Sequence, residues 1–412
     1  MWLHQINLYR SIMYRFLFSY LISAFCGWIL AFLVPLTIEG LTDSAFYTAA
    51  TYAVSYLPYL LVMPIGGVLA DVFNKKRMMQ FLELANVLFT GFLIMAIFIL
   101  RHVGLILLAH FMLCAVVAVQ HPVFQGMIPA IVSSEKAKNF HAYTGIMTHV
   151  IALAAPGLTG LLLMYFDKKM LFYGLGCGYL LGFVLISWVS YPHHHLKKEW
   201  GFRAIVKGLK EAFVYVLHEP FFKYTIILGV FSCFSQSFIS SNLIHYLKHH
   251  HGMSGEYISY CYIPMGLGSI IGSMLATYIV GRLPSAKVLL YSSTLEVITI
   301  GLLLVSSHVG LFIGLRSLRN MLISIYIVAY FTHRQKIVAP HLLSRTVAVT
   351  RMLAWTPIPL ASLSSGFLFE KTQSFQYLII ASGLSLSLGL LLSWRGLMHA
   401  ASKGEEEAAV CV

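Results

Sequence analysis

The sequence predicts an all-α integral membrane protein with twelve transmembrane helices in two pseudo-symmetric six-helix halves. Three observations favour this fold class: an apolar composition, twelve long apolar runs, and basic residues gathered on one side of the expected membrane. Hydrophobic residues make up 58% of the 412 residues and charged residues only 10%, whereas soluble domains are typically about 45–50% apolar and about 25% charged. Most of the surface is therefore expected to face lipid.

The apolar runs set the number of spans, because a spanning helix needs about 20 mostly apolar residues. Closed β-barrels also satisfy their backbone in lipid, but they show short alternating segments instead of continuous runs. The first run begins near Tyr14 and is too long for the apolar part of a cleavable signal peptide. We expect spans near residues 14–38, 45–70, 78–100, 103–124, 141–165, 170–190, 221–247, 255–280, 286–306, 309–332, 343–369 and 374–394.

The basic residues fix the expected orientation. With the N-terminus in the cytoplasm, 21 of the 28 lysines and arginines fall on cytoplasmic segments, 5 fall on the opposite side, and Arg316 and Arg319 fall inside a span. Cytoplasmic loops of membrane proteins carry such an excess. The sequence therefore predicts a multi-pass membrane protein with both termini cytoplasmic, and the net charge of +13 needs no nucleic acid to explain it.

The longest polar stretch divides the chain in the middle. It predicts an N-terminal six-helix half over residues 1–191, a cytoplasmic linker over 192–220 and a C-terminal half over 221–412. Residues 58–77 and 264–283 resemble each other weakly, with small residues at matching places. A half-length repeat is typical of secondary transporters.

A short motif between the second and third expected spans resembles the signature of a known family. Residues 67–77 read GVLADVFNKKR and resemble the loop signature of the major facilitator superfamily, roughly G-x-L-A-D-R-x-G-R-K. The resemblance implies the major facilitator fold and a loop that takes part in conformational change. The basic run would also anchor the turn at the anionic inner leaflet. The loop residues that it singles out are Gly67, Asp71, Lys75, Lys76 and Arg77.

Two positions of this loop depart from the signature. Val72 stands where the family usually has arginine, so a charge network around Asp71 is not implied. Asn74 stands where the family has glycine, and asparagine tolerates the left-handed backbone conformation better than most residues. We therefore expect the second replacement to be mild.

A narrower resemblance concerns other segments. Residues 128–139 and 340–347 resemble the corresponding loops of the enterobactin-exporter and macrolide-efflux branch, and residues 155–160 partly match the Pro/Gly motif of antiporter members. Antiporter members often carry an arginine in the fourth helix, where this chain has His110. The resemblance implies export.

Ionisable residues inside a membrane are costly, so each is a functional candidate. Glu296, near the middle of the ninth span, is the preferred proton carrier, because desolvation favours a neutral carboxyl group; a structural pairing with a basic residue is the alternative. Glu83 could instead reach the basic loop. Glu83, His110 and His149 complete the set of candidates for proton coupling, with helix–helix hydrogen bonding as the alternative for the histidines.

Arg316 and Arg319 are three residues apart and share a helix face. They could bind an anionic or catecholate-like solute, or pair with Glu296. Gln120, Asn86 and Gln236 are further candidates for lining a substrate cavity. Gly266, Gly268 and Gly272 lack the spacing of a dinucleotide site and predict close helix packing.

Other kinds of site find no support in the sequence. The six cysteines form no C-x-x-C pair, and the histidine runs 193–195 and 249–251 lie in expected loops without a clear ligand set. We therefore predict no metal site. No G-x-x-x-x-G-K-[ST] loop occurs, so ATP is not the expected energy source, and no cofactor is predicted.

These observations favour a secondary active transporter, not an enzyme. The first hypothesis is a monomeric, proton-coupled exporter that moves a siderophore-like or drug-like small molecule through the lipid bilayer of a bacterial inner membrane. An importer of a siderophore or small solute is the alternative, and a helical membrane enzyme or sensor is a remote one. Hydropathy fixes neither the direction of transport nor the choice between proton and sodium.

Overall fold

The structure, a computed structural model, describes eight parts of the chain, in which all regular secondary structure is helical. These parts are residues 2–63, 66, 73–132, 134–191, 202–280, 282–306, 308–338 and 340–410. Of the predicted motif loop, Lys75, Lys76 and Arg77 begin a helix, whereas Gly67 and Asp71 lie outside the described residues.

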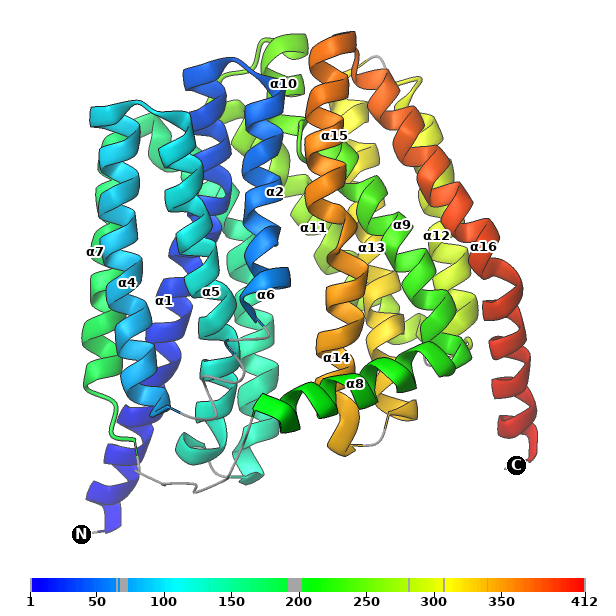
Figure 1. The fold of residues 1–412 in the computed structure, drawn as a ribbon, viewed down its shortest axis with the longest axis horizontal. Helices are drawn as coiled ribbons and strands as arrows, with labels where there is room; N and C mark the ends of the chain where they lie inside the picture. Colours follow the sequence, from blue (N-terminus) through cyan, green and yellow to red (C-terminus); the bar gives the residue numbers. More distant parts are fainter. Residues whose placement is uncertain are drawn as a thin grey trace. The chain divides into compact units, whose positions relative to one another are not determined.

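The helices follow the apolar runs along the chain (Figure 1). In order they are α1 (Trp2–Thr42), α2 (Ala45–Leu61), α4 (Lys75–Met95), the π-helix η1 (Ala96–Leu100), α5 (Val103–Ile131), α6 (Ser134–Tyr165), α7 (Lys168–Ser187), α8 (Phe202–His218), α9 (Pro220–Ser240), α10 (Leu243–His251), α11 (Gly255–Val280), α12 (Ser285–Leu303), α13 (Val309–Ile337), α14 (Pro340–Trp355), α15 (Pro357–Thr372) and α16 (Phe375–Val410).

Ten helical segments among the described residues are long and apolar enough to cross a membrane. The other two of the twelve spans are α2, whose expected course to residue 70 enters undescribed residues, and α6, where Val150–Tyr165 forms a shorter apolar helix. The twelve-helix membrane fold predicted from the sequence is therefore confirmed.

The chain divides into two compact units. The first contains Met1–Leu41 and Val54–Phe202, and within it α4 packs against both α5 and α7. The second contains Thr42–Ala53 and Arg203–Val412. The boundaries predicted at residues 191 and 221 stay a prediction.

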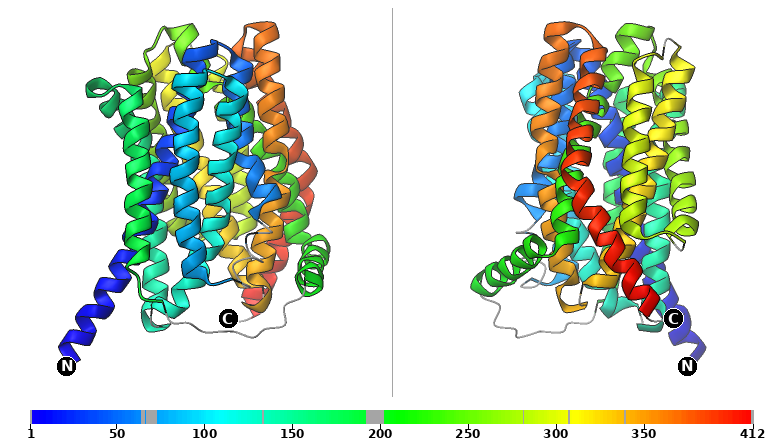
Figure 2. Two further views of the ribbon diagram at one scale, coloured as in Figure 1. Left: turned by 60° about the vertical axis from the view of Figure 1, so that its left-hand side comes forward. Right: turned by 90° about the vertical axis from the view of Figure 1, so that its right-hand side faces the viewer.

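In the second unit the most extensive helix–helix contacts join α11 to α13 and α9 to α16, and α12 also lies against α13 and α16. The short helix α8 lies at a steep angle to these long helices (Figure 2). It is tied to them by a hydrogen bond from the Tyr215 hydroxyl to the Ile337 carbonyl, 3.2 Å, and by an ion pair between Arg345 and Glu211, 3.5 Å.

Two expected spans of the second unit are broken. The predicted run 221–247 is divided into α9 and α10 at Ser241 and Asn242. The predicted run 343–369 is interrupted at Thr356, because α14 ends at Trp355 and α15 begins at Pro357. Serine and asparagine side chains compete with the backbone for hydrogen bonds, and proline is favoured in the first turn of a helix. The first break is stabilised by α15, because Asn242 Nδ2 donates to Ser365 Oγ at 2.8 Å.

The replacement at Asn74 acts differently from our expectation. Its φ of −61° and ψ of 110° are extended, not left-handed, and its side-chain oxygen accepts a hydrogen bond from the Arg77 backbone N–H. Asparagine is a favoured N-cap residue because it satisfies an otherwise unpaired N–H. Asn74 therefore fixes the start of α4, which carries Glu83.

Candidate functional site

A buried polar cluster in the first unit is centred on Glu83. Helix α4 places Glu83, Asn86 and Thr90 on one face, and all three are fully buried. Ser23 of α1 donates a hydrogen bond to Glu83 Oε1 at 2.6 Å. Asn86 Nδ2 donates to Gln120 Oε1 of α5 at 3.4 Å. Three helices thus direct polar side chains into one apolar core.

Gly182 of α7 makes room for this carboxyl group. A Cβ added at Gly182 would lie 3.3 Å from Glu83 Oε2 and 2.9 Å from Ser23 Oγ. The Gly182 carbonyl accepts a hydrogen bond from Ser19 at 2.9 Å. The absence of a side chain at this position therefore lets the Glu83 carboxyl group reach the α1–α7 contact.

Glu83 has no counter-ion among the described residues. Within the part of the chain that the structure describes, its Oε2 atom has no hydrogen-bond partner, and the same holds for Asn86 Oδ1, Gln120 Nε2 and Tyr179 Oη. Buried polar groups are normally hydrogen-bonded, so a group of exceptions in one place makes this cluster a candidate functional site.

The predicted histidines have different surroundings. His110 is buried on α5, and its Nε2 lies 2.9 Å from Ser55 Oγ of α2, which joins the two helices. His149 lies on α6, but its side chain is outside the described residues.

Glu296 lies in the second unit and is ion-paired. Arg319 Nε donates to Glu296 Oε1 at 2.9 Å, and the two side chains are 0% and 3% exposed. Arg319 Nη2 also donates to Ser235 Oγ at 2.8 Å, and this oxygen lies 2.6 Å from Ser382 Oγ. The pair therefore connects α12, α13, α9 and α16.

Arg316 is one helical turn from Arg319 but is less well satisfied. It is 2% exposed, and its Nη2 donates to Ser240 Oγ at 3.0 Å. Its Nε and Nη1 atoms, and Gln236 Oε1 of α9, have no hydrogen-bond partner among the described residues. Arg316 thus presents unused donors beside the break between α9 and α10, and discontinuous helices of this kind line the binding sites of many transporters.

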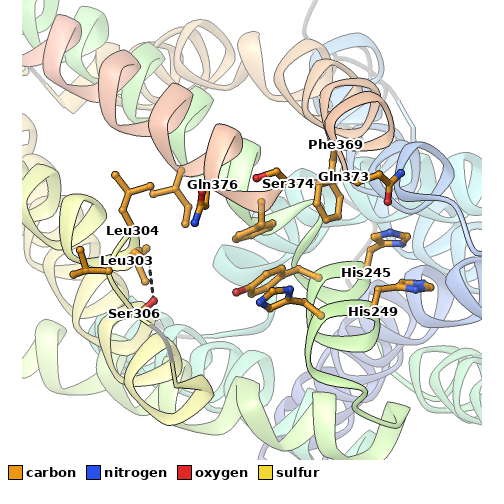
Figure 3. A pocket seen from close by; sticks show the side chains of 14 residues that line it. His245, His249, Leu303, Leu304, Ser306, Phe369, Gln373, Ser374 and Gln376 are labelled. Atoms are coloured by element: carbon orange, nitrogen blue, oxygen red, sulfur yellow. Dashed lines mark hydrogen bonds between the residues drawn. The ribbon is translucent and has the colours of Figure 1, made fainter.

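The second unit also contains a cavity of about 680 Å³ that none of these residues lines (Figure 3). Its walls come from α10, the end of α12, the end of α15 and the start of α16. His245, His249 and His250 contribute imidazole groups, and Gln373 and Gln376 contribute amides. Residues 249–251 form the last turn of α10, not the loop expected from the sequence.

The sequence analysis missed His245, which is 6% exposed. Its ring lies against the His249 ring, with 4.2 Å between the centroids. The four-residue spacing of the two histidines was the available signal, because side chains at i and i+4 of a helix are neighbours.

The solved structures that this chain resembles include several transporters. The structure resembles a mutant of the nucleoside transporter NupG, with a TM-score of 0.75 and 12% identity over 93% of this chain and 99% of that one. It also resembles a bacterial homologue of the iron transporter ferroportin, with a TM-score of 0.70 and 18% identity over 94% of this chain and 98% of that one. For the D-xylose–proton symporter the TM-score is 0.67, with 13% identity over 96% of this chain and 98% of that one.

At these identities the similar structures establish the fold alone. A comparison with curated proteins found no significant match. The sequence profile described as Major Facilitator Superfamily, however, matches residues 16–354, which is most of the chain. The chain therefore belongs to the Major Facilitator Superfamily, and it is a membrane transporter, not an enzyme.

Proposed function

We propose that the protein is a proton-coupled secondary transporter that exports a small organic molecule with an anionic or catecholate-like group across a bacterial inner membrane. The observation that carries the proton coupling is Glu83, a fully buried carboxyl group without a cation partner among the described residues. The export direction is supported by the resemblance of residues 128–139 and 340–347 to the enterobactin-exporter and macrolide-efflux branch.

The two intramembrane glutamates have different roles in this proposal. An uncompensated buried charge is costly, so gain or loss of a proton at Glu83 changes the local energy strongly and can favour one conformation over another. Glu296 already has Arg319 as a counter-ion, so its charge is compensated within the second unit. We therefore assign the proton to Glu83 and a mainly structural role to Glu296.

The solute is assigned to the second unit through Arg316. A guanidinium group binds carboxylate, phosphate or catecholate oxygens through several N–H donors at once. Two of the Arg316 donor atoms have no acceptor among the described residues. In the alternating-access mechanism of this kind of fold, the two six-helix halves would expose this site to each side in turn.

Glu83→Gln should abolish transport driven by a pH gradient while leaving solute exchange without a gradient intact. Glutamine keeps the size of the side chain but cannot carry the proton. The assay uses inside-out vesicles, a dye that reports the pH gradient, and catecholate or macrolide compounds added singly. Glu219→Gln, at the N-cap of α9, is the matched control and should transport like the wild type.

Full gradient-driven transport by the Glu83→Gln variant would overturn its assignment as proton carrier. A loss of gradient-driven transport in Glu296→Gln, with Glu83→Gln unaffected, would return the role to Glu296. If no compound releases protons from inside-out vesicles while labelled solute enters right-side-out vesicles, the protein is an importer.

Arg316→Gln should weaken solute binding by about 10–100-fold, since hydrogen bonds to charged groups are worth about 1.5–3 kcal/mol. Exchange measured across a range of solute concentrations gives the half-saturation concentration, which should rise, while the number of protons moved per solute stays unchanged. Asn320→Gln on the same helix is the control. An unchanged half-saturation concentration would place the solute elsewhere.

A further inference from the structure

A pair of histidines on α10 has the geometry of a chelating pair. His245 and His249 are one helical turn apart, and a ring nitrogen of one lies within 4.8 Å of a ring nitrogen of the other. Figure 3 shows both imidazoles directed to the same side of α10, at the wall of the cavity. His245 is buried, whereas the His249 side chain is 38% exposed, so an ion could reach the pair from solvent on the His249 side.

A carboxylate lies beside His249, the exposed member of this pair. Asp43 follows α1 in the segment Thr42–Ala53, which belongs to the second unit together with α10. Its Oδ1 atom is 3.2 Å from His249 Nε2. Asp43 has a φ of 53°, a left-handed conformation that aspartate and asparagine tolerate better than other residues with side chains. The carboxylate itself is held by its contacts to Lys248 and His249.

Imidazole is a ligand that zinc and other borderline divalent metals accept, and a ligating histidine is commonly paired with a carboxylate. We propose that His245 and His249 chelate a divalent transition-metal ion of the zinc type, with the Asp43 carboxylate as the outer partner of His249. The cavity beside the histidines leaves space for the further ligands, such as water or a solute group, that complete the coordination.

One nearby charge opposes the metal. Lys248 Nζ lies 2.5 Å from Asp43 Oδ1, and it is on α10 between the two histidines. A bound dication would be repelled by this ammonium group and would compete with it for the carboxylate. Neutralising Lys248 should therefore tighten metal binding, whereas removal of either histidine or of the Asp43 carboxylate should weaken it.

The test measures Zn²⁺ binding to the purified full chain in detergent by titration calorimetry, using an affinity tag without histidine. His193, His194 and His195 are changed to glutamine in every sample, because that run could bind Zn²⁺ independently. His245→Gln, His249→Gln and Asp43→Asn are compared with His250→Gln, the matched control, which removes an adjacent imidazole that stacks on Tyr246. A monodisperse elution profile shows that each variant is folded.

We expect one Zn²⁺ per chain, with a loss of at least about tenfold in affinity for the His245, His249 and Asp43 variants, since removing even an outer partner of a metal costs about 10–100-fold. His250→Gln should bind like the parent, and Lys248→Gln more tightly. Absence of Zn²⁺ binding in the parent would overturn the proposal and leave a histidine–carboxylate contact. Equal losses in His250→Gln and His249→Gln would overturn it as well. Because no transport is measured, failure here leaves the proposed function untouched.

Discussion

Arg319→Met is expected to cost about 3–5 kcal/mol of unfolding free energy, because it leaves the buried Glu296 carboxylate without its counter-ion. Arg319 is fully buried, and it donates both to Glu296 and to Ser235. Solvent cannot screen an uncompensated charge at this depth. Arg316, on the same helix, cannot replace it without giving up its hydrogen bond to Ser240. The thermal midpoint in detergent and the yield of monodisperse protein should both fall.

The double variant Glu296→Gln/Arg319→Met should recover much of that loss. Replacing both members of a buried ion pair by neutral groups is often nearly neutral. The comparison of the two single variants with the double variant isolates the coupling between the side chains. A double variant as unstable as Arg319→Met alone would show that the hydrogen bond to Ser235, not the charge on Glu296, makes Arg319 necessary. A variant Ser235→Ala measures that contact separately.

The twelve spans were predictable because length and hydropathy determine them almost alone. A lipid-spanning segment must satisfy its own backbone, so a long apolar run leaves few alternatives to a helix. The breaks at Asn242 and Thr356 were not predicted, since both lie within apolar runs of sufficient length. Their local signals are short: adjacent serines and an asparagine in the first case, and the prolines that begin α15 in the second.

The candidate site was predictable in residue type but not in grouping. Intramembrane charge alone singled out Glu83, Glu296, Arg316 and Arg319. Which of them meet depends on which helices are neighbours, and a single sequence does not contain that information. The sequence left the Glu296–Arg319 pair open as one of two alternatives, and the structure shows it formed. The Glu83 cluster joins α1, α4 and α5, and no spacing along the chain indicates it.

The pairing of the α10 histidines was missed for a different reason. Their spacing was visible, but the expected span ended at residue 247, which left 249–251 in a loop. In the structure α10 continues to His251 and ends at Gly252, whose φ of 61° is the left-handed conformation typical after a helix C-terminus. A boundary error of four residues was therefore enough to separate His245 from His249 in the interpretation.

The close packing of α11 on α13 predicts the second large effect on stability, that of adding a side chain to a glycine in the contact. Gly268 and Gly272 form a G-x-x-x-G pair on α11, as the sequence analysis expected for close packing. A Cβ added at either glycine would lie 2.2 Å from a backbone carbonyl oxygen of α13, that of Ser317 or Met321. Backbone atoms cannot move aside as a flexible side chain can, so the two helices would have to separate.

Gly272→Ala should therefore destabilise the protein by at least about 1–3 kcal/mol, the usual cost of overpacking. Gly314→Ala on α13 is the matched control, because nothing lies within 4 Å of a Cβ there. It should stabilise its helix by up to about 1 kcal/mol, since alanine is the better helix former. Thermal midpoints in detergent should therefore shift in opposite directions. Equal midpoints for the two variants would mean that α11 and α13 are not in backbone contact at Gly272.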